Sequence, residues 1–132
     1  PVVSSKGLVG HIVEVGPNSA IVQLILRSGG GISALVQERR AKGIVTWVHD
    51  RLFKLEWVDE NKEIRIGDRI ITSGLGGRFP KGIVVGSVSQ VQRPKRDPLF
   101  QEVFLTSEVD FWNLEEVFVL RPLPDPLDSL GM

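Results

Sequence analysis

Short apolar runs rich in valine and isoleucine, separated by turn-forming residues, set the fold class of this 132-residue chain. In the segment RLFKLEWV, the apolar residues Phe53, Leu55 and Trp57 alternate with charged ones, which is the period of a strand with one buried and one solvated face. The same reasoning predicts further strands, joined by turn-rich segments, at residues 7–15, 19–26, 43–48, 67–73, 81–91, 100–107 and 116–122. The sequence therefore predicts an all-β protein.

An internal repeat organises these strands. Residues 1–26 and 69–106 share one order: an apolar pair, a hydroxyl pair, Lys-Gly, a strand with an internal glycine, a turn and a second strand. The internal glycines, Gly10 and Gly86, suit β-bulges or the sharp coiling of a small closed barrel. The repeat predicts two related small β-subdomains. Because only the second repeat has a predicted strand before it, the strand edge at residues 1–5 is expected to be open to pairing with another chain.

The composition excludes several classes of protein. Sixteen basic side chains balance sixteen acidic ones, so no global field favours a polyanion or an anionic membrane. The absence of cysteine excludes disulfides and zinc sites that need sulfur. No apolar run reaches the roughly 18 residues of a spanning helix. Since the chain begins with Pro1, we expect a longer protein whose targeting segment lies upstream, and we expect the proline-rich tail at residues 122–132 to be disordered.

The densest run of glycine, TSGLGGRFPKG at residues 72–82, has the composition of a chemically active loop. A phosphate loop requires Gly-Lys-Ser/Thr at the start of a helix, whereas Lys81 precedes Gly82 and a predicted strand follows. A nucleophile elbow requires Gly-x-Ser-x-Gly, whereas Ser73 directly follows Thr72. The run is therefore interpreted as a turn between two strands.

A catalytic triad or a metal site would need histidine, and His11 and His49 are the only two. His11 lies within a predicted strand among valines, and His49 lies at a predicted hairpin entrance, so neither is close to Ser73 in the sequence. Two histidines without cysteine make a poor metal site. The sequence predicts no catalytic residue, no cofactor and no metal.

Two basic clusters, RRAK at residues 39–42 and RPKR at residues 93–96, leave one alternative open. Small β-barrels of the OB or SH3-like type bind nucleic acid through a basic face that carries aromatic side chains. In this chain acidic residues interleave with the basic ones and tyrosine is absent, so solvated turns explain the clusters better. A nucleic-acid-binding small barrel is kept as the alternative to a protein-interaction module.

Three segments, residues 7–25, 64–88 and 99–120, carry motifs that resemble those of a single protein family. A closing Leu-Glu-x-Val-x-Val-Leu spans residues 114–120. The middle block is the most specific, and its signature positions are Gly67, Asp68, Thr72, Ser73, Gly74, Leu75, Gly76, Gly77, Phe79, Pro80, Gly82 and Gly86. Together these motifs resemble the extracytoplasmic portion of the MreC family of bacterial rod shape-determining proteins.

The resemblance implies an all-β fold of two small related β-barrels, about six strands each, chymotrypsin-like in appearance but without a triad. It assigns residues 1–121 to this double-barrel region, with the first barrel truncated at its N-terminal side. Residues 19–60 and 61–120 are then expected to contribute mainly to different barrels. Glycines 74, 76 and 77 would supply conformations that residues with a Cβ resist.

The resemblance also implies a non-catalytic scaffold of the cell-elongation machinery, which organises peptidoglycan synthesis. The implied partners are the class B penicillin-binding transpeptidase, MreD, further copies of the protein itself and, through parts outside this chain, MreB. Nucleic acid is not among them. The protein would lie outside the cytoplasmic membrane, anchored by a transmembrane helix upstream of Pro1.

Three phenylalanines, Phe79, Phe100 and Phe111, are the candidate partner-binding residues. Phe79 follows the glycine run and precedes Pro80, a setting in which a large ring is often presented outward. Phe100 and Phe111 open or interrupt predicted strands, where the alternation leaves their orientation undecided. The alternative is that all three cap the ends of the barrels.

Overall fold

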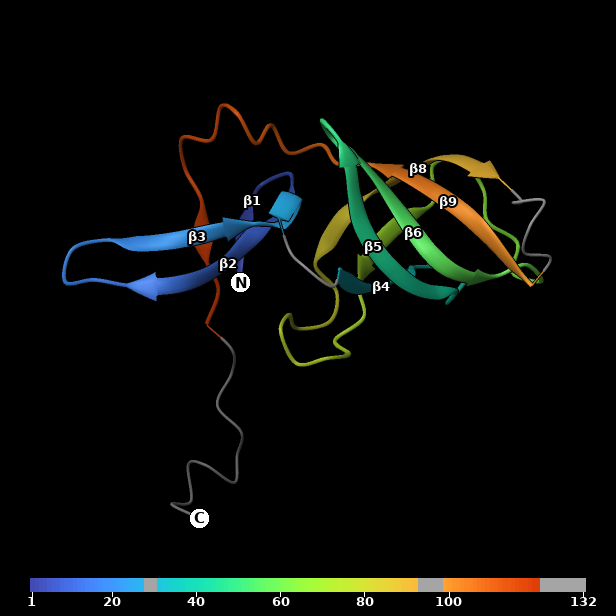
Figure 1. The fold of residues 1–132 in the computed structure, drawn as a ribbon, viewed down its shortest axis with the longest axis horizontal. Helices are drawn as coiled ribbons and strands as arrows, with labels where there is room; N and C mark the ends of the chain where they lie inside the picture. The colour runs from blue at the N-terminus through green and yellow to red at the C-terminus, as the bar shows by residue number, and fades with distance from the viewer. Residues whose placement is uncertain (28–30, 93–98, 122–132) are drawn as a thin grey trace, which may run out of the picture.

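The computed structural model describes residues 1–27, 31–92 and 99–121, and its ribbon is shown in Figure 1. The predicted disordered tail and the basic cluster at residues 93–96 lie outside these ranges. The described part contains one short 3-10 helix (Ile25–Arg27) and strands β1 (Val2–Ser4), β2 (Gly7–Val15), β3 (Ala20–Leu24), β4 (Ile32–Val36), β5 (Lys42–His49), β6 (Leu52–Asp59), β7 (Arg69–Thr72), β8 (Val84–Gln92), β9 (Phe100–Thr106) and β10 (Phe118–Val119). The predicted all-β class is confirmed.

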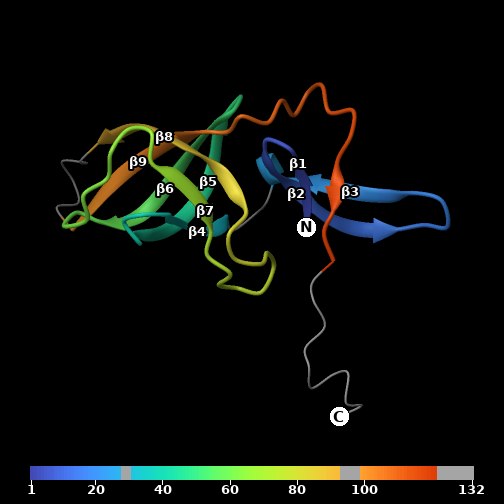
Figure 2. The ribbon, with the colours of Figure 1, turned by 180° about the vertical axis from the view of Figure 1, so that it is seen from behind.

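The strands form two units. A four-stranded antiparallel sheet has the order β10-β1-β2-β3, and a closed barrel has the order β4-β5-β6-β9-β8-β7. Figures 1 and 2 show the sheet at one end of the molecule and the barrel at the other. The two ends of the described chain meet in the sheet, where Val2 pairs with Val119 and the Leu120 N–H donates to the Pro1 carbonyl at 2.9 Å.

The division of the chain between the units differs from the expected one. Strands β4, β5 and β6, from residues 19–60, close a single barrel with β7, β8 and β9, from residues 61–120. Each range supplies a three-stranded meander whose outer strands pair with those of the other, β4 with β7 and β6 with β9. Pairing both outer strands leaves no open edge in the barrel. The expectation that the two ranges build different barrels is therefore wrong.

For the first unit the expectation is a barrel truncated at its N-terminal side. In the described residues it is an open four-stranded sheet rather than a second closed barrel. The strand edge at residues 1–5 is not free, because β1 lies between β2 and β10. The open edges of this sheet are those of β3 and β10.

The internal repeat has a counterpart in strand register. In each repeat the first strand pairs with the internal glycine and with the residue two positions before it, so one buried valine sits in a bulge. The pairs are Val2 with Gly10 and Val3 with Leu8 around Val9, and Ile70 with Gly86 and Ile71 with Val84 around Val85. The glycines allow close approach of the next strand, since a Cβ on Gly86 would lie 2.5 Å from the Thr106 carbonyl oxygen, and one on Gly10 would collide with the Gln23 carbonyl.

One hydrophobic core runs through both units. The two units meet tightly at Gly7, where an added Cβ would lie 2.8 Å from the Val84 carbonyl oxygen. The buried side chains of the sheet include Val2, Leu8 and Val9, and those of the barrel include Val45, Phe53, Leu55, Ile70, Val103 and Leu105. Burial of these apolar side chains stabilises both units together.

Strand β6 departs from its predicted alternation at Trp57. Phe53 and Leu55 are fully buried, but Trp57 is 61% exposed and Val58 takes the next buried place. Leu55 pairs with Val103 and Val58 with Gln101, so two residues of β6 face one residue of β9. This β-bulge shifts the alternation by one residue and turns the indole outward.

Candidate functional site

The glycine-rich segment forms the loop between β7 and β8. Gly74, Gly76 and Gly77 have φ values of 82°, 85° and 71°, and Gly82 has φ of 99°. All four lie in the left-handed region, which glycine adopts without steric cost. The loop therefore depends on glycine for its shape, in agreement with the expectation for Gly74, Gly76 and Gly77.

Thr72 closes the base of this loop. Its side chain is fully buried, and its Oγ1 donates to the Pro80 carbonyl at 2.6 Å and accepts from the Ile83 N–H at 2.9 Å. Its backbone carbonyl accepts from the Gly82 N–H at 2.9 Å. Thr72, Pro80 and Gly82 of the signature thus hold the two ends of the loop together.

Gly67 and Asp68 form the turn that leads into β7. The Gly67 N–H donates to the Val88 carbonyl, and the Val88 N–H donates to the Asp68 carbonyl, both at 2.8 Å. The Asp68 carboxylate accepts from the Arg65 N–H at 3.0 Å and from Arg39 Nε at 3.4 Å. This turn fixes the start of β7, from which the glycine-rich loop emerges.

Phe79 connects the loop to the four-stranded sheet. Its ring is only 6% exposed and contacts the His11 ring of β2 edge-on, with the ring centroids 5.8 Å apart. The loop of the barrel lies between the barrel and the sheet in Figure 2. The outward presentation predicted for Phe79 is wrong, because burial against the sheet is available to the ring and stabilises it there.

His11 lies on the sheet side of this contact. Its Nδ1 is buried and has no hydrogen-bond partner in the described part of the structure. Burial lowers the pKa of His11 from its ordinary value of 6.5, and the positive charges of Arg78 and of the Pro1 amino group lower this pKa further. The folded protein therefore favours the neutral imidazole.

We expect the protein to become less stable as the pH is lowered, because of His11. Its lowered folded-state pKa means that the unfolded chain takes up the proton first, so the stabilisation is complete above 6.5 and is lost as the pH falls below that value. Urea unfolding at about pH 7.5, 6.5 and 5.5 measures the effect. His11→Gln should flatten the dependence, and His49→Gln, at an exposed hairpin position, is the control. An unchanged dependence in His11→Gln would contradict the assignment.

Ser73 and the two histidines do not form a hydrogen-bonded triad in the described residues. The Ser73 hydroxyl accepts from the Leu75 N–H of its own loop at 3.2 Å, and His49 Nδ1 lies 3.3 Å from Asp50. Neither histidine is hydrogen-bonded to Ser73 in residues 1–27, 31–92 and 99–121. Within these ranges there is also no group of three or more His, Cys, Asp or Glu that could hold a metal ion.

The two other candidate partner-binding residues, Phe100 and Phe111, have different surroundings. Phe111 is buried and packs at 6.3 Å from Phe53, so it caps the barrel, as the alternative for the three phenylalanines proposed. Phe100 is half-buried and contacts the Trp57 ring edge-on, with centroids 5.6 Å apart. Of the three phenylalanines, only Phe100 has a side chain accessible enough to contact a partner protein.

The sequence pattern did not identify the apolar side chains that are accessible. All three tryptophans are well exposed, Trp112 to 60%. Of the other large exposed side chains, seven lie on the β2–β3 hairpin or around β10: Val13, Val15, Ile21, Val117, Phe118, Val119 and Leu120. Val48, Ile66, Leu75 and Leu99 lie elsewhere. These exposed residues lie beside charged or turn residues, and that position could have indicated their exposure. The alternation in residues 51–58, taken alone, assigned Trp57 to the core.

The model of the rod shape-determining protein MreC, barrel core, matches residues 1–121. The chain belongs to the MreC family. The cell shape-determining protein MreC of Listeria monocytogenes is 33% identical over 125 residues, which cover 91% of this chain and 42% of that protein. MreC of Escherichia coli is 40% identical over 94 residues, which cover 70% of this chain and 25% of that protein. The chain thus spans less than half the length of these relatives.

Solved MreC structures share the fold. The Listeria monocytogenes structure matches with a TM-score of 0.78 and 31% identity over 88% of this chain and 57% of that one. A structure described as the major periplasmic domain of MreC has a TM-score of 0.66 and 28% identity, covering 83% and 68%. A complex between a penicillin-binding protein (PBP2) and MreC from Helicobacter pylori contains the same fold, with a TM-score of 0.66 and 22% identity over 83% and 68%. In the described part of this chain, no helix has the length and hydrophobicity to cross a membrane.

Proposed function

We propose that this chain is a non-catalytic scaffold module of the bacterial cell-elongation machinery, which binds a class B penicillin-binding transpeptidase. The observation that carries the proposal is membership of the cell shape-determining MreC family. A relative with the same fold was solved in complex with a penicillin-binding protein, and this supports the choice of partner.

The internal geometry supports a structural role for the family signature. Thr72, Pro80 and Gly82 close a loop, Gly67 and Asp68 form a turn, and Phe79 joins the two units. These contacts, several of them made by the backbone, are the kind that hold a fold together. The accessible apolar side chains are the groups left to bind another protein.

The proposal extends to the other partners of the machinery. We place the chain outside the cytoplasmic membrane, on an anchor helix upstream of Pro1, which fits a relative solved as a periplasmic domain. Association with MreD, with MreB through parts beyond this chain, and with further copies of the protein completes the proposed scaffold. Light scattering on the purified chain measures the self-association.

We expect the chain to bind the extracytoplasmic region of the transpeptidase through exposed apolar side chains rather than charged turns. Ile21→Ala, Trp112→Ala and Phe118→Ala each test one exposed site, and we expect at least one of them to weaken binding by about 2 kcal/mol. Lys62→Ala and Glu116→Ala are the charge controls, with little expected effect. Calorimetry measures the affinity after each variant has passed a thermal melt. Loss of binding in the charge controls alone would contradict the proposal.

The nucleic-acid alternative is tested on the same samples. A barrel that binds RNA through phosphate contacts loses affinity steeply as salt rises, whereas an apolar protein interface does not. Electrophoretic shift with RNA at low and moderate salt should detect no complex. A salt-sensitive RNA complex, without transpeptidase binding, would favour the alternative.

A further inference from the structure

The outer face of β6 and β9, at the barrel end away from the four-stranded sheet, carries an exposed aromatic pair. Trp57 is 61% exposed, and its ring meets that of Phe100 at 5.6 Å with an interplanar angle of 87°. Figure 1 places this end of β6 and β9 opposite the sheet. Exposed tryptophan on a well-ordered support is the side chain most enriched among residues that dominate protein interfaces.

The backbone holds the indole outward at an energetic cost. Trp57 has φ of 67°, and a bulky residue in this left-handed region is a strained outlier. The core does not need the ring, since Val58 fills the buried position that follows. Strain of this kind is concentrated at functional sites.

The neighbouring turn is firmly fixed. The buried Gln101 donates through Nε2 to the carbonyls of Asp59 at 2.9 Å and Lys62 at 2.6 Å. The Glu60 N–H donates to the Leu99 carbonyl at 3.1 Å. These bonds tie the end of β6 to the start of β9, so the aromatic pair stands on a rigid support.

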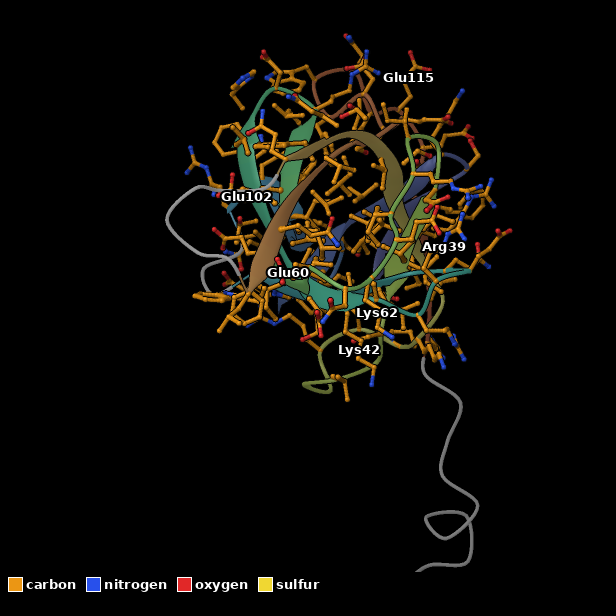
Figure 3. All side chains as sticks on the ribbon, turned by 90° about the vertical axis from the view of Figure 1, so that its right-hand side faces the viewer. Arg39, Lys42, Glu60, Lys62, Glu102 and Glu115 are labelled. Carbon is orange, nitrogen blue, oxygen red and sulfur yellow. The ribbon has the colours of Figure 1, made fainter. Side chains whose placement is uncertain are left out.

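The two strands that carry the aromatic pair also carry three carboxylates and one lysine, Glu56, Asp59, Glu102 and Lys54. Lys54 lies 3.0 Å from Glu56 and 3.9 Å from Glu102, so two carboxylates share one ammonium group on this face. Asp59 pairs with Phe100 across the strands. Figure 3 looks onto this end of the barrel, with Glu102 on the left, Glu60 and Lys62 near the centre and Arg39 on the right. On β6 and β9 the carboxylates therefore outnumber the single lysine, which pairs with two of them.

We propose that the Trp57 surface, formed by Trp57, Phe100, Glu56 and Glu102, binds an apolar peptide segment of a partner protein that carries arginine or lysine. The cation would lie over the indole face and beside the carboxylates, where the ring quadrupole and the negative charges both attract it. Because the barrel has no open edge, the partner docks through side chains rather than by strand addition. The inference goes beyond the proposed scaffold role, since it specifies a surface and the chemistry of its ligand whichever protein supplies the segment.

The charges favour this occupant over others. A second copy docking through the same face would bring like charges together, which is unfavourable. A nucleic acid would bring phosphates toward the same carboxylates. A cationic segment with apolar flanks satisfies both the aromatic pair and the excess of carboxylates.

Two synthetic peptides test the inference: acetyl-Leu-Arg-Leu-Arg-Leu-amide and its analogue with citrulline in place of both arginines. NMR titration should shift the Trp57 indole N–H signal with the arginine peptide, with affinity about fivefold higher than for citrulline, the uncharged near-isostere. The double variant Glu56→Gln/Glu102→Gln should remove most of this difference. Equal affinity for both peptides, or no binding at millimolar concentration, would overturn the inference. Because the transpeptidase is absent from this experiment, its result is independent of the proposed function.

Two variants separate binding from folding. Trp57→Gly should abolish the binding while the melting temperature stays the same or rises, because glycine adopts the left-handed conformation without strain. Trp112→Ala removes a tryptophan of similar exposure and should leave peptide binding unchanged, because its ring neighbours Phe111, which packs on Phe53 at the start of β6. Binding that is retained in Trp57→Gly would place the peptide elsewhere and refute the inference. Binding that is lost in Trp112→Ala but not in Trp57→Gly would do the same.

Discussion

Replacing Gly86 by valine is expected to lower the free energy of unfolding by about 3 kcal/mol. The position is buried in β8, and an added Cβ would lie 2.5 Å from the Thr106 carbonyl oxygen and 3.2 Å from Leu105 Cδ1. The obstacle is backbone in the neighbouring strand of a closed barrel, so relief requires the β8–β9 ladder to open. Gly10→Val, at the equivalent position of the first repeat, should have a comparable effect through the Gln23 carbonyl.

Two other glycines provide the controls. Gly76 has open space around it but φ of 85°, so Gly76→Val should cost about 1–2 kcal/mol from backbone strain alone. Gly16→Ala, with neither positive φ nor a close contact under 3.4 Å, should change stability by no more than about 0.5 kcal/mol. Urea unfolding of the four variants measures the order. If Gly86→Val were as stable as Gly16→Ala, close strand approach would not explain the internal glycines.

Local patterns in the sequence predicted most of the strands. Strand β2 occupies the predicted residues 7–15, and β5, β8 and β9 differ from their predictions by three residues or fewer at either end. These segments have alternating or β-branched side chains, so propensity and burial agree along them. Strand β4, with the sequence ISALV, was missed because it is short and is flanked by glycines and by a charged turn.

Barrel closure was not predictable in this way. It depends on β4 pairing with β7 and β6 with β9, contacts between distant segments that leave no periodic trace in either one. The bulge at Trp57 illustrates the same limit, since one extra residue exchanges the inward and outward faces. A pattern of period two is therefore reliable only up to the first bulge.

For the candidate site, the sequence predicted the backbone conformation better than the orientation of the side chains. Glycines 74, 76 and 77 have the left-handed conformations that the sequence suggested, because φ preference is a local property. Whether Phe79 points outward depends on what lies opposite the loop. That partner is His11, 68 positions earlier in the numbering, so no local signal identified it.

Replacing Phe79 by alanine is expected to lower the free energy of unfolding by about 3–5 kcal/mol. The ring is almost fully buried and belongs to the core that joins the barrel to the sheet. Its loss leaves a cavity between two units, and it also exposes His11, whose lowered pKa depends first on burial. The variant should therefore be less stable at all pH values and less dependent on pH. Urea unfolding at about pH 7.5 and 5.5 measures both effects.

Leu75→Ala is the matched control for this prediction. Leu75 lies in the same loop but is 58% exposed, so its truncation should change stability by about 0.5 kcal/mol or less. The two variants also separate folding from recognition, because a fully folded Phe79→Ala protein that failed to bind the transpeptidase would mean that the ring contacts the partner. If instead Phe79→Ala is destabilised and its folded fraction binds normally, the loop acts by joining the sheet to the barrel. That outcome would explain why a segment with the composition of a reactive loop uses its one large ring, its threonine and its glycines to hold two β-units together.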